Sequence, residues 1–189
     1  MSYQADIFVS YRRSATVGRW VRQFLVPLLA ERLDENSPTN VQLFIDENIP
    51  PGAPWPRHLR EMLKRSKLLL PIWSANYFRS SWCMAEWESF RRRERLLNTQ
   101  GALIYPIAYS GNTYFHPDAK ATQTIDFSTL ASTEEGFRAA PDWLRFDRLV
   151  TTVATDLVTR IQAAPPWRSD FPITEPEPMP DPVMERPRL

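Results

Sequence analysis

The stretch KLLLPIW at residues 67–73 decides the fold class of this chain. Lys67 is its only charged residue, and the apolar side chains follow one another instead of alternating with polar ones. Continuous apolar runs of this length are typical of strands in parallel sheets, whose two faces are both covered by helices. The sequence therefore predicts a buried strand inside an α/β fold. The run is far too short to span a bilayer.

The segments before and after this strand repeat an alternation of apolar runs and helical patterns. Short apolar runs predict further strands at residues 6–11, 41–45, 102–108 and 124–127. Apolar side chains at helical spacing, together with capping residues, predict helices at residues 18–33, 57–66, 81–97 and 142–162. Strands that alternate with helices form a mainly parallel sheet with helices on both sides, joined by right-handed crossovers.

The last part of the chain differs in composition from the rest. Eight of the 26 residues from 164 to 189 are proline, and acidic residues stand between them. Such a segment cannot form a helix and has little to bury. We therefore predict a folded domain at residues 1–163 and a mostly disordered tail at residues 164–189. The tail serves either as a solubilising end or as a docking peptide for a partner.

Charge and cysteine content exclude several classes of protein. A formal net charge of +1 makes nucleic acid an unlikely direct ligand and offers no attraction to an anionic membrane. Cys83 is the only cysteine, which excludes a disulfide framework and a cysteine zinc site within one chain, and no metal site is predicted. The N-terminus lacks the pattern of a secretory signal, so we expect a cytoplasmic protein.

The pentapeptide WCMAE at residues 82–86 places a carboxylate on the apolar face of a predicted helix. Residues three and four apart share a helix face, which here carries Trp82, Cys83, Glu86, Trp87 and Phe90. Glu86 is the only charge among them. A carboxylate in such surroundings is either satisfied by a neighbour, such as a backbone N–H or an arginine, or held for chemistry. The pentapeptide alone leaves both interpretations open.

A ligand site is expected where the parallel strands end. In open α/β sheets, ligands bind beyond the carboxyl ends of the strands. Three segments, at residues 10–13, 46–55 and 74–81, follow predicted strands at that edge. We take as candidate ligand-binding residues Ser10, Tyr11, Arg12, Arg13, Asp46, Trp55, Tyr77, Trp82 and Cys83.

These side chains suit a ligand with flat rings, phosphates and a sugar. The aromatic side chains could stack on a base or a pyridine ring, and the arginines could pair with phosphate oxygens or remain solvated. Cys83 has no histidine near it in sequence, which favours small-residue packing over a nucleophilic role. Glu88 points to another face of the helix from Glu86, and Asp46 is the remaining conceivable second acid.

Three sequence boxes resemble those of Toll/interleukin-1 receptor (TIR) domains. DIFVSY at residues 6–11 is similar to the first strand of the family, and residues 44–55 to its second strand and long loop. Residues 70–86 are similar to its third strand and third helix, including a Trp-x-x-x-Glu pattern that ends at Glu86. The resemblance implies a flavodoxin-like three-layer sandwich around a mostly parallel five-stranded sheet.

The resemblance also implies one of two functions. Many family members cleave NAD+ at the nicotinamide–ribose bond and require a glutamate at the position of Glu86, with no cofactor beyond the substrate. Such a protein would be an NAD+ glycohydrolase or cyclase, acting as a bacterial defence effector that is activated by self-association or by a separate sensor protein. Other members are non-enzymatic TIR–TIR interaction modules in signalling.

Overall fold

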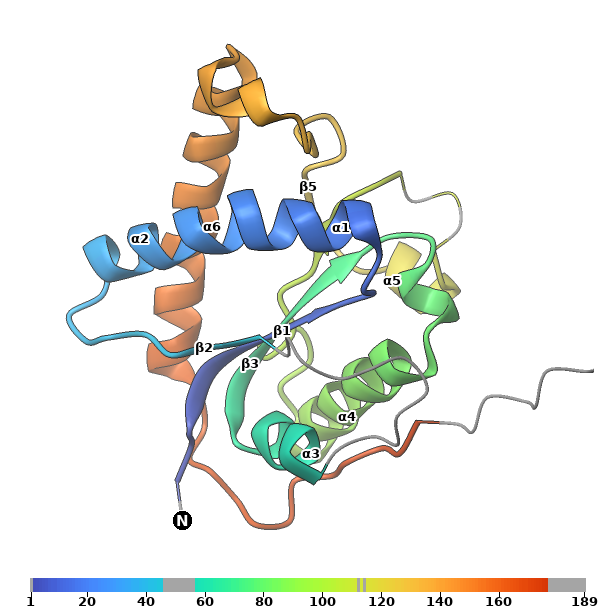
Figure 1. Cartoon of the computed structure of the whole chain (residues 1–189). Helices are drawn as coiled ribbons and strands as arrows, with labels where there is room; N and C mark the ends of the chain where they lie inside the picture. The colour runs from blue at the N-terminus through green and yellow to red at the C-terminus, as the bar shows by residue number, and fades with distance from the viewer. Residues whose placement is uncertain (1, 46–56, 112, 114, 177–189) are drawn as a thin grey trace, which may run out of the picture.

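The computed structural model of the chain describes residues 2–45, 57–111, 113 and 115–176. A five-stranded sheet in the order β2-β1-β3-β4-β5 forms its centre, and every neighbouring pair of strands is parallel. The strands are β1 (Ala5–Tyr11), β2 (Leu43–Ile45), β3 (Ser66–Trp73), β4 (Ile107–Ala108) and β5 (Ile125–Asp126). All five predicted strands are therefore confirmed (Figure 1). The strands β2, β4 and β5 are shorter than predicted, whereas β1 and β3 each begin one residue earlier.

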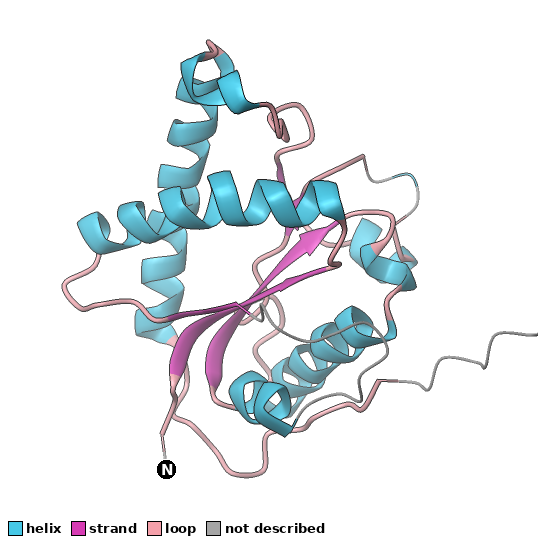
Figure 2. Ribbon diagram, in the orientation of Figure 1, coloured by secondary structure: helices cyan, strands magenta, loops and turns pink. Residues whose placement is uncertain are grey.

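Helices cover both faces of the sheet, as the apolar character of β3 predicts. One face carries α1 (Ala15–Trp20), η1 (Val21–Leu25), α2 (Val26–Asn36) and α6 (Asp142–Ala163). The other face carries α3 (Arg57–Lys64) and α4 (Ser81–Leu97), as Figure 2 shows. These three layers and the strand order confirm the predicted flavodoxin-like sandwich. None of the helices in the described part of the chain has both the length and the apolar character that a transmembrane span requires.

The first helical segment is continuous but not regular. It changes from α1 to a single π turn, η1, before continuing as α2. Pro27 stands at the start of α2 and has no backbone N–H to donate to the carbonyl four residues earlier. Most π turns in proteins are single widened turns of this kind inside an α-helix.

The strand β4 is shorter than its apolar run because Pro106 interrupts it. Leu69 N of β3 donates to Leu103 O, and Tyr105 N donates to Leu69 O. Pairing with β3 then resumes at Ile107. Proline cannot donate to a ladder, so the pairing divides in two. Beyond β4, the polar region that sequence patterns left without a helical stripe holds α5 (Pro117–Lys120), β5 and η4 (Glu135–Ala139).

Residues 164–176 lie against the domain as an extended strap, in contrast to the expectation of disorder from residue 164. The strap leaves the end of α6, passes the amino-terminal edge of the sheet and reaches α3 and α4 (Figure 1). Tyr3 Oη donates to Pro165 O at 2.8 Å, and Thr174 N donates to Ser89 Oγ at 2.8 Å. Phe171 is 2 % exposed. The predicted tail beyond residue 176 lies outside the described residues.

Candidate functional site

Glu86 owes its position to the capped start of α4. The helix begins after Ser80, whose Oγ accepts a hydrogen bond from Cys83 N at 3.4 Å. This cap satisfies one of the free N–H groups at the helix start. The predicted helix start is therefore confirmed, and Glu86 falls in the second turn with its side chain only 7 % exposed.

The Glu86 carboxylate is held by a hydroxyl from the neighbouring strand. Ser10, the next-to-last residue of β1, donates through Oγ to Glu86 Oε2 at 2.6 Å. Ser10 Oγ also lies 2.9 Å from Tyr77 Oη, which lies 3.2 Å from Cys83 O. Four residues from β1, η2 (Tyr77–Arg79) and α4 thus form one buried network.

The network lies at the edge of the sheet where ligand sites are expected. The carboxyl ends of β1 and β3 meet there, because the two strands are parallel neighbours with Ser10 opposite Pro71 and Tyr11 opposite Ile72. The chain crosses between these strands from the β2 side of the sheet to the β4 side, so the edge is a topological switch point. The predicted edge location of Ser10, Tyr77, Cys83 and Glu86 agrees with the structure.

Electrostatics in the network favour neutral partners around one carboxylate. Burial raises the pKa of the Tyr77 phenol well above its ordinary value, and electrostatic interactions with Cys83 and with the Glu86 carboxylate act in the same direction. Burial also raises the pKa of the Cys83 thiol, and Glu86 raises it further. The thiol therefore stays protonated at neutral pH, which fits packing and not nucleophilic attack.

Tyr11 is not brought to Glu86. Successive residues of a strand point to opposite faces, so Tyr11 points away from the face that Ser10 occupies. Its Oη accepts a hydrogen bond from Arg22 Nη1 in η1, at 3.5 Å, on the side covered by α1, α2 and α6. Tyr11 is also buried. This arrangement leaves no stacking surface of Tyr11 beside the carboxylate.

The arginines and Trp82 have different positions. Arg12 is exposed, and its guanidinium is near enough to oppose the rise in the pKa of Cys83. Arg13 is half-buried. Trp82 is half-buried against the core, one helical turn before Glu86. Arg12 and Trp82 therefore remain able to contact a ligand at this edge.

Two of the predicted ligand-binding residues, Asp46 and Trp55, lie outside the described residues. Sequence patterns did not single out Ser74, which directly follows β3 at the same edge. Its buried hydroxyl has no hydrogen-bond partner among the residues that the structure describes. A serine after an apolar strand is too common a pattern to mark such a position.

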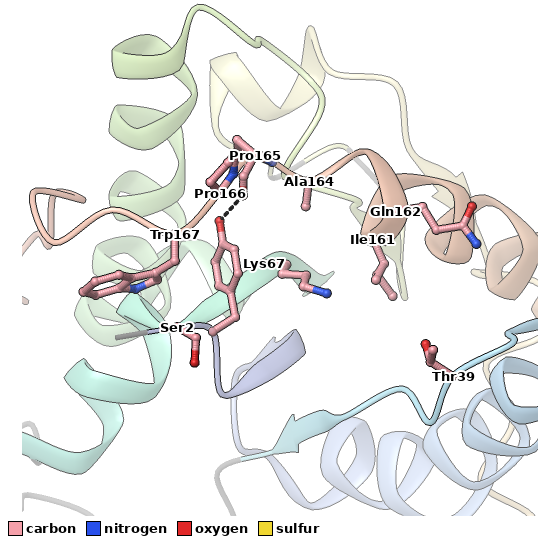
Figure 3. Close-up of a pocket in the computed structure, with 10 residues that line it drawn as sticks. Ser2, Thr39, Lys67, Ile161, Gln162, Ala164, Pro165, Pro166 and Trp167 are labelled. Atoms are coloured by element: carbon pink, nitrogen blue, oxygen red, sulfur yellow. Dashed lines mark hydrogen bonds between the residues drawn. The ribbon is translucent and has the colours of Figure 1, made fainter.

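A pocket of about 550 Å³ lies at the opposite edge of the sheet (Figure 3). It is lined by the residues around the N-terminus, the start of β3, the end of α6 and the strap: Ser2, Tyr3, Thr39, Lys67, Ile161, Gln162, Ala164, Pro165, Pro166 and Trp167. Lys67 Nζ pairs with Asp6 at 2.7 Å. The pocket shares no residue with the Glu86 network.

Comparison with models of known protein families agrees with the fold. A family model described as "TIR domain" matches residues 7–140, which is more than half of the chain. Among solved structures, the chain is similar to the TIR domains of the activated Roq1 resistosome directly recognizing the pathogen effector XopQ, with 22 % identity and a TM-score of 0.41. That alignment covers 80 % of this chain and 84 % of the other. No curated protein matches the sequence.

Proposed function

Because the chain belongs to the TIR domain family, we propose that it cleaves the nicotinamide–ribose bond of NAD+ with Glu86 as the catalytic residue. The observation that carries the proposal is the carboxylate of Glu86, buried at the switch point of the sheet and held there by Ser10. A carboxylate buried beside apolar side chains at such an edge is a candidate for chemistry.

The reaction needs a negative charge beside the anomeric carbon more than it needs an acid. When the bond from the anomeric carbon to the nicotinamide nitrogen breaks, its electron pair passes to the nitrogen, so nicotinamide leaves as a neutral molecule. The ribose acquires oxocarbenium character, which the Glu86 carboxylate would stabilise while it accepts hydrogen bonds from the ribose hydroxyls. Attack by water then forms ADP-ribose and releases a proton.

Other residues of the edge would bind the remaining parts of NAD+. The guanidinium of Arg12 suits the diphosphate, and the indole of Trp82 offers a surface on which a ring can stack. Attack by an adenine nitrogen or a ribose hydroxyl in place of water would give a cyclic product. Neither NAD+ cleavage route calls for a bound metal or cofactor.

The proposal includes a setting for this activity. A protein that consumes NAD+ must be controlled, and self-association through TIR surfaces, or a separate sensor protein, would supply that control. We propose a defence effector of the bacterial cytoplasm in which assembly activates the enzyme. Activity per protomer should then rise with protein concentration.

The first test is NAD+ turnover at low and high protein concentration, with the products separated by mass. Wild type should cleave NAD+, and Glu86→Ala should lose activity by about 10²- to 10³-fold or more, because the charge that stabilises the transition state is gone. Glu88→Ala is the matched control, since it removes the same group from the same helix. Glu88 pairs with Arg91, Arg92 and Arg95 on the outer face of α4.

Each outcome decides between the two functions. Cleavage by wild type and Glu88→Ala but not by Glu86→Ala supports the enzyme, and the product mass separates hydrolysis from cyclisation. Equal cleavage by all three proteins would refute the role of Glu86. An absence of cleavage at every concentration, with concentration-dependent self-association, would favour the non-enzymatic interaction module.

A further inference from the structure

We propose that Ser10 and Tyr77 are positioning residues, which fix the carboxylate of Glu86 without touching the substrate. The inference deepens the proposed function and rests on it for its kinetic test. It replaces the expectation, drawn from the sequence, that both side chains bind the ligand directly.

Burial separates these two residues from a ligand. Ser10 is 2 % exposed and Tyr77 is 0 % exposed. The Tyr77 ring packs edge-on against Phe78, with the ring centroids 5.4 Å apart. A base or pyridine ring cannot stack on a phenol that has no accessible surface. The hydroxyl groups of both residues are therefore committed to protein partners.

The direction of each hydrogen bond follows from the number of protons. The Ser10 hydroxyl has one proton, and its 2.6 Å contact gives that proton to Glu86 Oε2. In the 2.9 Å contact between Ser10 Oγ and Tyr77 Oη, the phenol must then be the donor. Burial raises the pKa of the phenol well above its ordinary value, so this proton is retained. The longer contact of Tyr77 Oη with Cys83 O competes for the same proton.

The hydrogen-bond relay from Tyr77 through Ser10 to Glu86 joins three elements that are separate in sequence. Ser10 comes from β1, Tyr77 from η2 and Glu86 from α4. A glutamate side chain has three rotatable bonds, and a donor fixed on the rigid strand selects one arrangement of them. The donor also stabilises negative charge where burial opposes it. Catalytic carboxylates act most effectively when they are oriented before the substrate binds.

The kinetic test compares Ser10→Ala, Ser10→Thr and Tyr77→Phe for NAD+ turnover. Ser10→Ala should lower kcat by about 10- to 100-fold, as expected for loss of a hydrogen bond to a charged group, with little change in KM. Ser10→Thr retains the hydroxyl, so its kcat should be close to that of wild type. Tyr77→Phe should lower kcat by about two- to tenfold, since it acts through Ser10.

The double variant Ser10→Ala/Tyr77→Phe distinguishes a relay from two separate effects. If Tyr77 acts only through Ser10, the double variant should be no slower than Ser10→Ala. Ser66→Ala is the matched control because Ser66 is equally buried, at the amino end of β3, where its Oγ donates to Met62 O. A rise in KM with unchanged kcat in Ser10→Ala, or a kcat equal to that of Ser66→Ala, would overturn the proposal.

A second measurement does not depend on activity. Urea unfolding of wild type, Ser10→Ala, Glu86→Ala and the double variant Ser10→Ala/Glu86→Ala gives a thermodynamic cycle for the Ser10–Glu86 pair. We expect the two single effects on the unfolding equilibrium constant to be clearly non-additive. Additive effects would refute the contact between Ser10 and Glu86 in solution. If the effects are non-additive but none of the proteins turns over NAD+, only the proposed function is refuted.

Discussion

Three charged side chains of α4 are buried, and each contacts a different kind of group. Glu86 accepts from the Ser10 hydroxyl, and Glu94 Oε1 accepts from the backbone N–H groups of Leu103 and Ile104 at 2.7 and 3.1 Å. Arg93 is 0 % exposed and lies with its guanidinium 4.1 Å from the Phe90 ring centroid and 4.4 Å from that of Phe171. Its burial lowers the pKa of this guanidinium to about 10.

Arg93 closes the carboxyl end of α3. Its Nη1 donates to Ser66 O at 2.7 Å, and its Nη2 donates to Leu63 O at 3.1 Å. The last carbonyls of a helix have no partner within the helix, and a cation also complements the helix dipole there. The side chain thus joins α4 to the connection between α3 and β3.

Replacement of Arg93 should be far more damaging than replacement of its neighbour. Arg93→Ala leaves buried carbonyls without donors and opens a cavity, so we expect the free energy of unfolding to fall by about 3–5 kcal/mol. Arg92→Ala, the matched control, removes an exposed side chain paired with Glu88 and should cost less than about 1 kcal/mol. Urea unfolding followed by tryptophan fluorescence measures both. Similar losses in the two variants would contradict this account of Arg93.

Sequence reasoning predicted that Glu86 lies on a buried helix face but missed the burial of Arg93, and the reason is physical. The run of arginines at residues 91–93 is typical of a solvated helix end, whereas the spacing of Glu86, Phe90 and Arg93 at i, i+4 and i+7 places them on one buried stripe. Spacing therefore carried the correct signal. Which acceptors would satisfy a buried guanidinium depends on α3 and β3, and no local pattern encodes that meeting.

At the scale of elements, capping residues in the sequence were sufficient to predict where α4 begins and ends. The bounds of α4 agree with the prediction of 81–97 because Ser80 caps the start, and Asn98 ends the helix in the left-handed region with φ of 53°. The strap at residues 164–176 was missed because its composition is that of a disordered segment. Phe171, packed on Arg93, is an anchor contact that the average composition hides.

The strap should therefore contribute to stability. A chain ending at residue 163 loses Phe171 from the face of Arg93, the Thr174–Ser89 hydrogen bond and the Arg60–Glu175 ion pair. We expect the truncated chain to unfold at a clearly lower temperature, and Phe171→Ala alone to lower the free energy of unfolding by about 2–4 kcal/mol. A chain ending at residue 176 keeps every contact described here and is the control. Equal melting temperatures for all these chains would show that the strap does not dock in solution.

At the scale of the whole molecule, the two edges of the sheet differ in the residues that lie there. The carboxyl edge presents Glu86 at the switch point, while the strap and the N-terminal segment meet across the amino edge through Tyr3 and Pro165, beside the pocket of Figure 3. Parallel strands dictate this asymmetry, because all their carboxyl ends lie on one side. The fold class alone was enough to predict the edge at which Glu86 lies, although it could not specify which hydroxyl would hold the carboxylate.

The stability of the whole domain should decrease in alkaline solution because of its buried tyrosines. Tyr105 Oη donates to Asp156 Oδ2 at 2.8 Å, which joins the β4 segment to α6. Burial raises the pKa of this phenol, and the bond to Asp156 raises it further, while burial likewise raises the pKa of Tyr77. Above the unfolded-state value near 10.0, the unfolded chain loses protons that the folded chain retains.

The sign of the effect follows directly. The stabilisation is complete below about pH 10 and is lost as the pH rises through the folded-state pKa, by up to about 1.4 kcal/mol per pH unit for each such tyrosine. Urea unfolding of wild type and Tyr105→Phe at a series of pH values from neutral to strongly alkaline measures it. The Phe variant should be less stable at neutral pH, because Asp156 loses its donor, yet its stability should fall less steeply above pH 10. Parallel curves for the two proteins would contradict the raised pKa of Tyr105, since an offset alone reports only the lost hydrogen bond.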